Sequence, residues 1–223
     1  MNVQSPVHIG QVIRNAVVFD FKNWTGGLAL TNPDTLLQTV PRLFALLDER
    51  AIDYVLVGGV ALLTYVEGRN TQDIDLIMTL SALERLPEIK IQSQEEDFVR
   101  GEFEGLQIDI LLARNPLFAK VRAEYVTKQK LMEREIPTAT IQGLLLLKLY
   151  ALPPLYRQGN FARVGLYEND VATLHYYNPA MTPLFETLKS YVSAGEMVEL
   201  RKIVQEIEQR LERFQNSGRE KAS

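Results

Sequence analysis

The segment that most constrains the fold is a short apolar run that ends at a pair of glycines. Asp53–Val57 (DYVLV) carries the aromatic and β-branched residues typical of a buried strand, and Gly58-Gly59 ends it. Val60–Val66 follows directly and has the composition of a short apolar helix. We therefore predict a strand, a glycine turn and a helix in direct succession, which places the glycine backbone at the start of a helix.

Paired aspartates follow on the next predicted strand, Asp73–Leu80 (DIDLIMTL). Side chains two residues apart on a strand share a face, so Asp73 and Asp75 project together. Asp109 takes the same kind of position in Gly105–Leu112 (GLQIDILL), a further predicted strand. If the two strands are neighbours, three carboxylates share one face and repel one another unless a divalent cation lies between them.

The composition limits which cation is expected. The 223 residues include no cysteine and only two histidines, which excludes disulfides, iron–sulfur clusters and zinc sites built on thiolate or imidazole. Carboxylate oxygens prefer hard cations. We therefore expect Mg²⁺ or Mn²⁺ at Asp73, Asp75 and Asp109.

Gly58 and Gly59 supply the complement of such a metal site. Residues without a Cβ atom let a phosphate approach the backbone closely, and the helix that follows offers free N–H groups and its positive dipole end to an anion. A triphosphate bound there would lie against the metal held by the aspartates. In-line attack on its α-phosphate then requires a base for the acceptor hydroxyl, and Asp109 is the candidate.

Each of these signals is weak alone. A single Asp-x-Asp on a strand is usually a solvated edge, a glycine pair after a strand is usually a turn, and Asp109 between two isoleucines fits an exposed strand position. In this order and within 52 residues, they favour metal-dependent chemistry on a nucleotide.

The rest of the chain predicts an α+β protein. We expect an N-terminal extension (1–32), a mixed α/β core (33–115), a mostly helical portion (116–215) and a polar tail (216–223). Leu117–Arg134 predicts an amphipathic helix, and Ser81 predicts the cap of a helix that ends at Leu86. Thr140 predicts the cap of a helix over Ile141–Leu152, ended by Pro153-Pro154.

Charge and hydropathy bound the partners. A net charge of −4 argues against a protein that coats nucleic acid through bulk charge. The chain has no apolar run long enough to span a bilayer and no secretory signal at its start, so we expect no membrane partner and a cytoplasmic location. The stretch 113–135 carries an excess of three positive charges, which suits a nucleic-acid acceptor or, equally, a solvated helix face. Its cations are Arg114, Lys120, Arg122, Lys128, Lys130 and Arg134.

At these residues the chain resembles the DNA polymerase β-type nucleotidyltransferase superfamily. The shared pattern is an apolar residue, two small residues, a spacer, Asp–apolar–Asp–apolar and a later carboxylate. The chain presents it as Val57-Gly58-Gly59, thirteen residues, Asp73-Ile74-Asp75-Leu76 and Asp109. The resemblance implies a mixed β-sheet with flanking helices, a nucleoside triphosphate substrate and a magnesium (or manganese) ion.

Within that superfamily, three further details resemble the AbiEii-like branch of bacterial toxins. Arg69 and Thr71 precede the first aspartate, Lys148 lies between two leucines, and Asn169-Asp170 lies on a later predicted helix. The branch usually has a lysine where this chain has Asn169, and often an aspartate at the position of Thr173.

The branch resemblance implies roles for individual residues. Asp73, Asp75, Lys148 and Asp170 would belong to the active site, and Lys148 would contact phosphates. With Gly58, Gly59, Arg69 and Thr71, Lys148 would form the nucleotide-binding set. Members of the branch transfer nucleotides, some of them to the 3′ end of tRNA, and some pair with a cognate antitoxin.

Three functions remain open at the level of sequence. The first is a nucleotidyltransferase acting on RNA or protein, with an antitoxin as a further partner. The second is transfer to a small molecule such as an aminoglycoside, which uses the same metal core and favours an acidic acceptor pocket. The third is a non-catalytic nucleotide-binding protein, which the presence of all three aspartates disfavours.

Overall fold

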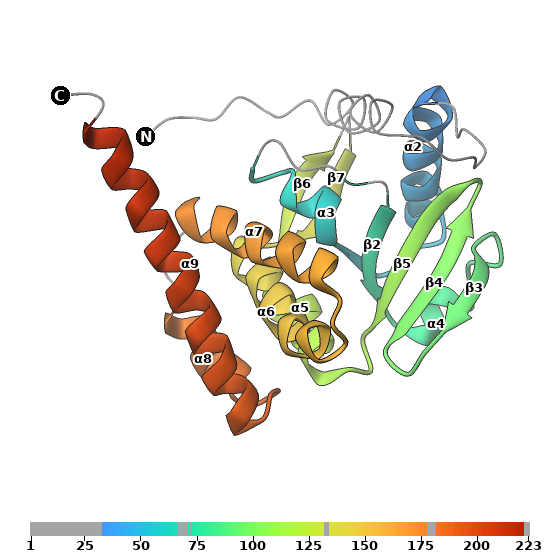
Figure 1. The fold of residues 1–223 in the computed structure, drawn as a ribbon. Helices are drawn as coiled ribbons and strands as arrows, with labels where there is room; N and C mark the ends of the chain where they lie inside the picture. Colours follow the sequence, from blue (N-terminus) through green and yellow to red (C-terminus); the bar gives the residue numbers. More distant parts are fainter. Residues whose placement is uncertain (1–32, 67–70, 72, 132–133, 178–181, 221–223) are drawn as a thin grey trace. The chain divides into compact units, whose positions relative to one another are not determined.

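The computed structural model describes residues 33–66, 71, 73–131, 134–177 and 182–220 (Figure 1). The chain divides into two compact units, Met1–Thr140 and Ile141–Ser223, which we term the sheet unit and the helical unit. The predicted α+β class, a mixed β-sheet followed by helices, is confirmed. Among the described helices, none combines the length and the apolar character needed to cross a bilayer.

The sheet unit holds one seven-stranded sheet in the order β3-β4-β5-β2-β1-β7-β6 (Figure 1). Its elements in chain order are α2 (Pro33–Glu49), β1 (Tyr54–Val57), α3 (Gly58–Leu62), β2 (Asp73–Met78), α4 (Leu80–Leu83), β3 (Lys90–Gln94), β4 (Phe98–Phe103), β5 (Leu106–Leu112), α5 (Pro116–Glu124), β6 (Val126–Leu131) and β7 (Arg134–Ala139).

The centre of the sheet is formed by the strands predicted from sequence. β2 pairs with β1 in antiparallel and with β5 in parallel orientation. Tyr54 is opposite Met78, so the two side chains share a face, and the Tyr54 ring contacts Phe44 of α2 at a centroid distance of 5.8 Å. Helix α2 therefore packs on the apolar face of the central strands, which leaves the opposite face for the polar side chains.

A tight hairpin joins β4 to β5. Its two-residue turn, Glu104-Gly105, has φ angles of 51° and 82°, the left-handed pair that matches the twist of adjoining strands. The strand pairing that follows is regular from Phe103↔Leu106 to Phe98↔Leu111. We did not predict β3 or β4 from the sequence.

The predicted helix over 117–134 is wrong in its second half. Helix α5 ends at Glu124, and β6 begins at Val126 and pairs with β7. The helix-like spacing of apolar residues in α5 continues past Glu124. The residues that follow nevertheless form strand β6, in which successive side chains lie on opposite faces. β6 and β7 consequently belong to the sheet unit, which extends to Thr140 rather than to residue 115.

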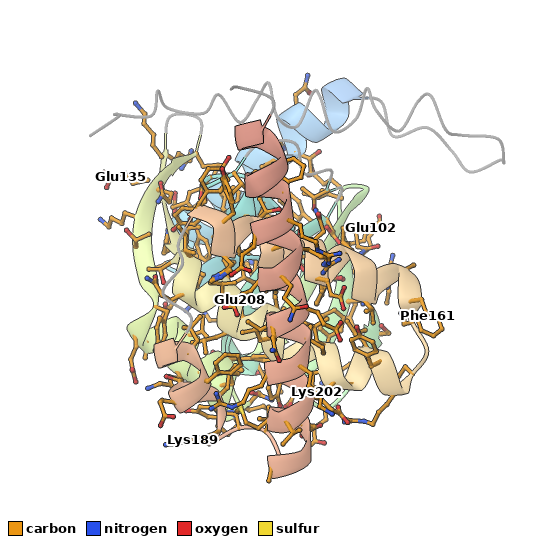
Figure 2. All side chains as sticks on the ribbon, turned by 60° about the vertical axis from the view of Figure 1, so that its left-hand side comes forward. Glu102, Glu135, Phe161, Lys189, Lys202 and Glu208 are labelled. Carbon is orange, nitrogen blue, oxygen red and sulfur yellow. The ribbon has the colours of Figure 1, made fainter. Side chains whose placement is uncertain are left out.

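The described part of the helical unit forms α6 (Ile141–Arg157), α7 (Phe161–Tyr177), α8 (Thr182–Leu188) and α9 (Ala194–Glu220). Pro153-Pro154 were predicted to end this helix, but they lie inside α6. The helix continues to Arg157, and Leu155, just after the prolines, is buried. α9 likewise continues as helix through the predicted tail to Glu220. Phe161, at the start of α7, is 74% exposed and projects from the ribbon (Figure 2).

A helix cap also differs from its prediction. Thr79, rather than Ser81, caps α4, and its side chain accepts a hydrogen bond from the Ala82 N–H at 3.1 Å. The Ser81 hydroxyl lies 3.0 Å from that of Thr79. The cap lies two residues earlier than the pattern indicated, because threonine supplies the same kind of capping oxygen as serine.

Candidate functional site

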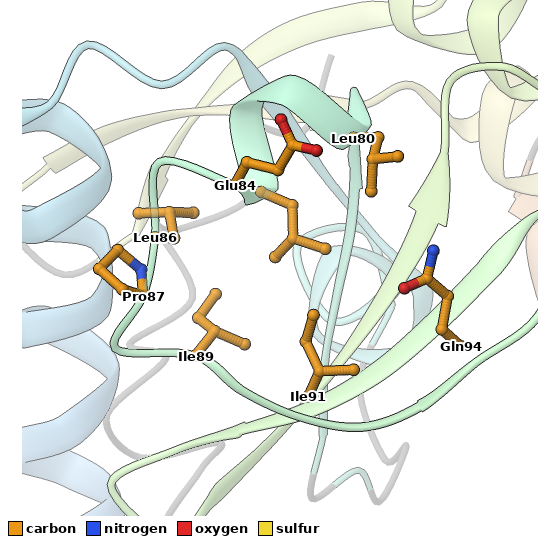
Figure 3. Close-up of a pocket in the computed structure, with 8 residues that line it drawn as sticks. Leu80, Glu84, Leu86, Pro87, Ile89, Ile91 and Gln94 are labelled. Carbon is orange, nitrogen blue, oxygen red and sulfur yellow. The ribbon is translucent and has the colours of Figure 1, made fainter.

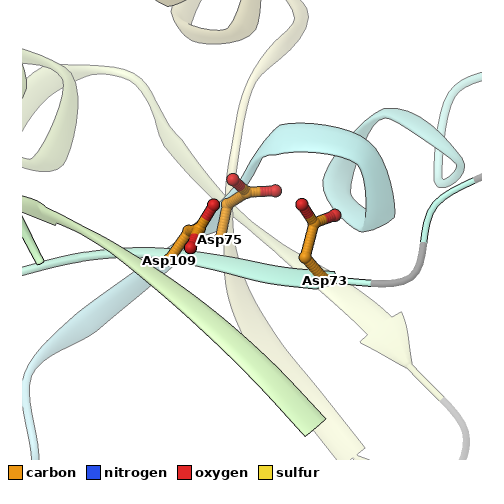
Figure 4. A group of neighbouring side chains, drawn as sticks. All are labelled: Asp73, Asp75 and Asp109. Carbon is orange, nitrogen blue, oxygen red and sulfur yellow. The ribbon is translucent and has the colours of Figure 1, made fainter. Parts of the chain in front are cut away.

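The three predicted carboxylates lie together on the polar face of the sheet. Asp75 of β2 is directly opposite Asp109 of β5, and Asp73 lies two residues earlier on β2. One carboxylate oxygen from each residue lies within 4.8 Å of the others. Figure 4 shows the three side chains on the same side of the two strands, next to α3.

Burial makes this arrangement costly without a counter-charge. Asp109 is 3% exposed, and Asp73 and Asp75 are half-buried. Like charges at such distances repel strongly when water is excluded. The cluster therefore needs cations, either from the protein or from solution.

The glycine pair adjoins the carboxylates. Gly58 has a φ of +64°, and a Cβ atom on it would lie 1.8 Å from Asp75 Oδ2. A Cβ atom on Gly59 would lie 2.3 Å from Thr71 Oγ1. Two side chains of the site itself, Asp75 and Thr71, thus occupy the space beside the glycines.

Neutral donors orient Asp73 and Asp75. The Gly59 N–H donates to Asp75 Oδ2 at 3.3 Å, and the Thr71 hydroxyl donates to Asp73 Oδ1 at 2.8 Å. Thr71, predicted to contact the nucleotide, therefore holds a carboxylate in place. Arg69, predicted to act beside it, lies outside the described residues.

Arg100 of β4 completes the group and was not predicted. Its Nε donates to Asp109 Oδ1 and its Nη2 to Asp109 Oδ2, each at 2.9 Å, in the two-pronged geometry of the strongest ion pairs. Gln107 Nε2 donates to Asp109 Oδ1 at 3.3 Å. The hydrogen bonds to Asp109, followed by the negative charges of the three aspartates, raise the pKa of Arg100 against the opposing effect of partial burial.

A sequence signal for Arg100 exists in the hairpin. Glu104-Gly105 fits a two-residue turn between β-strands, and counting backward and forward from it pairs Arg100 with Asp109. A left-handed glutamate is uncommon in such turns, which is why the pattern is easy to miss.

The ion pair bears on the predicted role of Asp109 as a base. Both oxygens of Asp109 accept hydrogen bonds from the Arg100 guanidinium. An acceptor hydroxyl that approached Asp109 would therefore meet oxygens that already accept hydrogen bonds from Arg100.

Lys148 and Asp170, predicted from the family resemblance, meet each other inside the helical unit. Lys148 Nζ lies 3.0 Å from Asp170 Oδ2, and the two side chains are 7% and 1% exposed. The same ammonium lies 3.8 Å from the centroid of the Tyr167 ring. One positive and one negative charge are thus paired and shielded, with an aromatic face as an additional partner.

The predicted basic stretch is largely neutralised. Of its six cations, five form ion pairs with carboxylates of the sheet unit, and the stretch divides between α5, β6 and β7. The pairs are Arg114–Asp97, Lys120–Glu124, Arg122–Asp53, Lys128–Glu135 and Arg134–Asp48. It is neither one helix face nor a continuous unpaired track of positive charge.

A separate pocket of about 310 Å³ lies beside β3 (Figure 3). Its lining consists of Leu80, Leu83, Glu84, Leu86, Pro87, Ile89, Ile91 and Gln94. Glu84 is the only charged residue among these eight. Its lining has one carboxylate and no cationic side chain, so it does not repeat the cluster of carboxylates, and it does not include the aspartates.

Comparisons with known proteins return nucleotidyltransferases among solved structures. No family model and no curated protein sequence match the chain. An antigenic nucleotidyltransferase-like protein from Paracoccidioides brasiliensis is similar at 15% identity and a TM-score of 0.42, over 68% of this chain and 92% of that one.

A second similar protein is the antibiotic-resistance factor ANT(2″)-Ia. Its solution structure has 14% identity and a TM-score of 0.45, over 82% of this chain and 98% of that one. Its crystal structure, in complex with adenylyl-2″-tobramycin, has 13% identity and a TM-score of 0.43, over 62% and 93%. At these scores, the assignment of a function depends on the geometry of the chain itself.

Proposed function

We propose that the chain is a nucleotidyltransferase that moves a nucleoside monophosphate from a nucleoside triphosphate to an acceptor hydroxyl. The observation that carries the proposal is the meeting of Asp73, Asp75 and Asp109 on one sheet face, with one ligand atom from each within 4.8 Å of the others. The glycine turn beside them and the order of these features along the chain support the same chemistry.

The donor set fits a hard divalent cation. All three candidate ligands are carboxylate oxygens, which Mg²⁺ and Mn²⁺ prefer. Because one oxygen from each carboxylate already lies within 4.8 Å of the others, small side-chain rotations would let Asp73, Asp75 and Asp109 hold one ion. When bound, the ion would neutralise the charge that develops on the transferred phosphate.

The residues around the carboxylates would then prepare them for this task. Thr71 and the Gly59 N–H fix the orientation of Asp73 and Asp75, which would hold the ion. Such preorganisation matters because a displacement of about 1 Å at a reacting centre costs on the order of 100-fold in rate. The nucleotide contacts of Gly58, Gly59, Arg69, Thr71 and Lys148, the active-site role of Asp170, and the membership in the AbiEii-like branch stay predictions.

Two classes of acceptor are compatible with this proposal: a macromolecule and a small molecule. RNA, including the 3′ end of tRNA, and protein remain candidates through the family resemblance, and a cognate antitoxin would be a partner in that case. The ion pairing of the basic stretch removes the main charge argument for RNA. A polycationic small molecule, such as an aminoglycoside, is the second candidate because four carboxylates on the polar face of the sheet, the three aspartates and Glu102, outnumber Arg100 and Lys90 on that face.

The test is transfer of radiolabel from each of the four nucleoside triphosphates, with Mg²⁺, to total RNA, tRNA, a protein extract and aminoglycosides. We expect label on one acceptor class and a loss on the order of 1,000-fold in Asp73→Asn, because an amide cannot replace a charged ligand. Asp48→Asn is the matched control, since Asp48 is half-exposed and pairs with Arg134 away from the site.

Two results would count against the proposal. Labelling that persists in Asp73→Asn would reject the assignment of the metal-binding pair. Nucleotide binding without transfer to any acceptor would favour the non-catalytic alternative.

A further inference from the structure

The pocket beside β3 lies on the face of the sheet opposite to the aspartates. Ile91 of β3 is opposite Gly101 of β4, and Gly101 is opposite Ile108 of β5. Ile108 and Asp109 are neighbours on one strand, so their side chains project to opposite faces. A molecule bound in this pocket is therefore separate from the proposed ion site.

Apolar side chains form most of the pocket and reach solvent at its edge. Its apolar residues are Leu80, Leu83, Leu86, Pro87, Ile89 and Ile91. Figure 3 shows Leu80, Ile89 and Ile91 around this space of about 310 Å³. Ile91 is 52% exposed and Leu80 is 37% exposed. A partner that covered these two side chains would remove apolar surface from water, which favours binding.

Exposed carboxylates accompany the apolar lining. Glu84 belongs to the lining, and Glu95 and Glu96 lie in the turn between β3 and β4. All three residues are exposed, and none of them forms an ion pair with another described residue. By contrast, Glu88 and Asp97 beside them pair with arginines. The three remaining carboxylates favour a partner with positive charge.

The nearest cations are directed elsewhere. Lys90 is opposite Glu102 on β4, which places it on the other face of the sheet. The guanidinium of Arg85 donates to the backbone carbonyl of Arg50. The acidic character of the pocket's surroundings is therefore not cancelled by either side chain.

The backbone of β3 offers a further means of binding. β3 is at one end of the strand order, so among the described strands only β4 pairs with it. The Glu95 N–H donates to the Phe98 carbonyl at 2.8 Å, and antiparallel alternation then places the N–H and C=O of Gln94 on the side away from β4. A register shift between Ile91 and Ser93 interrupts this edge, which disfavours long pairing with the same edge of a second copy.

We propose that the β3 edge and its pocket bind an extended segment of a partner protein, in which an apolar side chain is flanked by lysine or arginine. The apolar side chain would fill the pocket, and the cationic ones would lie near Glu84, Glu95 and Glu96. The backbone of the segment would pair with β3 at Gln94, as in other cases of strand addition to a sheet edge. This inference does not depend on the proposed transfer reaction.

The test begins with selection of short random peptides, displayed on phage, against the full chain. We expect enriched sequences that place an apolar residue beside lysine or arginine. A synthetic peptide of the enriched sequence, titrated by fluorescence anisotropy, should bind the wild type and lose affinity as the NaCl concentration rises. Binding should also slow hydrogen exchange of the Gln94 backbone amide.

Surface variants locate the binding site with little risk to the fold. Ile91→Ser should weaken peptide binding on the order of 10-fold, because it removes an apolar contact. Glu95→Lys/Glu96→Lys should weaken it on the order of 10-fold by reversing two charges. Val198→Ser and Glu199→Lys are the matched controls, since Val198 is 54% exposed and both residues lie on α9. Each control should stay within about 2-fold of the wild type.

Several results would overturn the inference. Selection that yields no peptide, or acidic ones, would reject the stated chemistry of the partner. Unchanged affinity in Ile91→Ser would place binding elsewhere, and equal affinity for a peptide with a fully N-methylated backbone would reject strand addition. A dimer in light scattering that Ile91→Ser dissociates would assign the surface to a second copy of the chain.

Discussion

Each of the two units of this protein gathers a charged cluster around a deeply buried carboxylate, and the clusters differ in which charges they bring together. In the sheet unit, three carboxylates lie together, and Asp109, which pairs with Arg100, is 3% exposed. In the helical unit, Lys148 pairs with Asp170, and the two residues are 6% and 1% exposed. Burial alone therefore does not separate a ligand site from a structural ion pair. A cluster that gathers three carboxylates fits a bound cation, whereas the Lys148–Asp170 pair joins one charge of each sign.

The largest effect on stability is expected where the charges are balanced. Lys148→Met should destabilise the helical unit by about 3–5 kcal/mol, because it leaves Asp170 buried without its counter-charge. Lys148→Met/Asp170→Leu should recover most of that loss, since well-packed apolar residues replace a buried pair at little cost. Hydrogen exchange of the α6 and α7 amides reports the effect within this unit.

The control for this pair is Lys189→Met in the same unit. Lys189 pairs with Glu186, both side chains are 60% exposed, and the change should stay within about 0.5 kcal/mol. If Lys148→Met is as mild as this control, the buried pair contributes little to stability and its predicted role at phosphates gains weight.

An intermediate effect is expected at the glycine turn beside the three carboxylates. Gly58→Ala should lower transfer activity on the order of 100-fold, because its Cβ atom would displace the Asp75 carboxylate. The left-handed backbone adds a cost of about 1–2 kcal/mol to stability. Initial rates of label transfer and thermal unfolding measure the two effects separately.

Gly159→Ala is the control that separates the effect of backbone strain from the effect of displacing the Asp75 carboxylate. Gly159 has a φ of +65°, and a Cβ atom on it meets nothing within 4 Å. This variant should show a similar loss of stability with nearly unchanged activity. Equal activity losses in both variants would mean that the Gly58 effect is strain alone.

The smallest effect is expected at an exposed contact of the helical unit. The Tyr156 hydroxyl donates to Glu168, and burial first, then this hydrogen bond, raises the pKa of Tyr156 from 10.0 to about 12. Because the folded pKa is the higher one, the stabilisation is complete below pH 10 and is lost as pH rises toward 12. Unfolding of the wild type and Tyr156→Phe across this range measures it, and parallel pH curves would contradict the assignment.

The central strands and the three aspartates were predictable because they depend on local patterns. Alternation along β2 and β5 placed Asp73, Asp75 and Asp109 on polar faces, and the glycine pair marked the end of β1. The length of α5 was not predictable in this way, since the spacing of its apolar residues continues into β6. The Pro153-Pro154 pair was misread because a local rule for ending a helix was overridden by the burial of Leu155.

The amino-acid sequence by itself determined which residues carry the charges of the site and which face of its own strand each one occupies, because side-chain alternation is a property of a single strand. Tertiary structure alone decided the charges' partners. The parallel pairing of β2 with β5 brings Asp75 to Asp109 across 34 residues of chain, and packing in the helical unit brings Lys148 to Asp170. Whether a buried charge is balanced depends on these distant neighbours, and for that reason the difference between the two clusters could not be read from either segment alone.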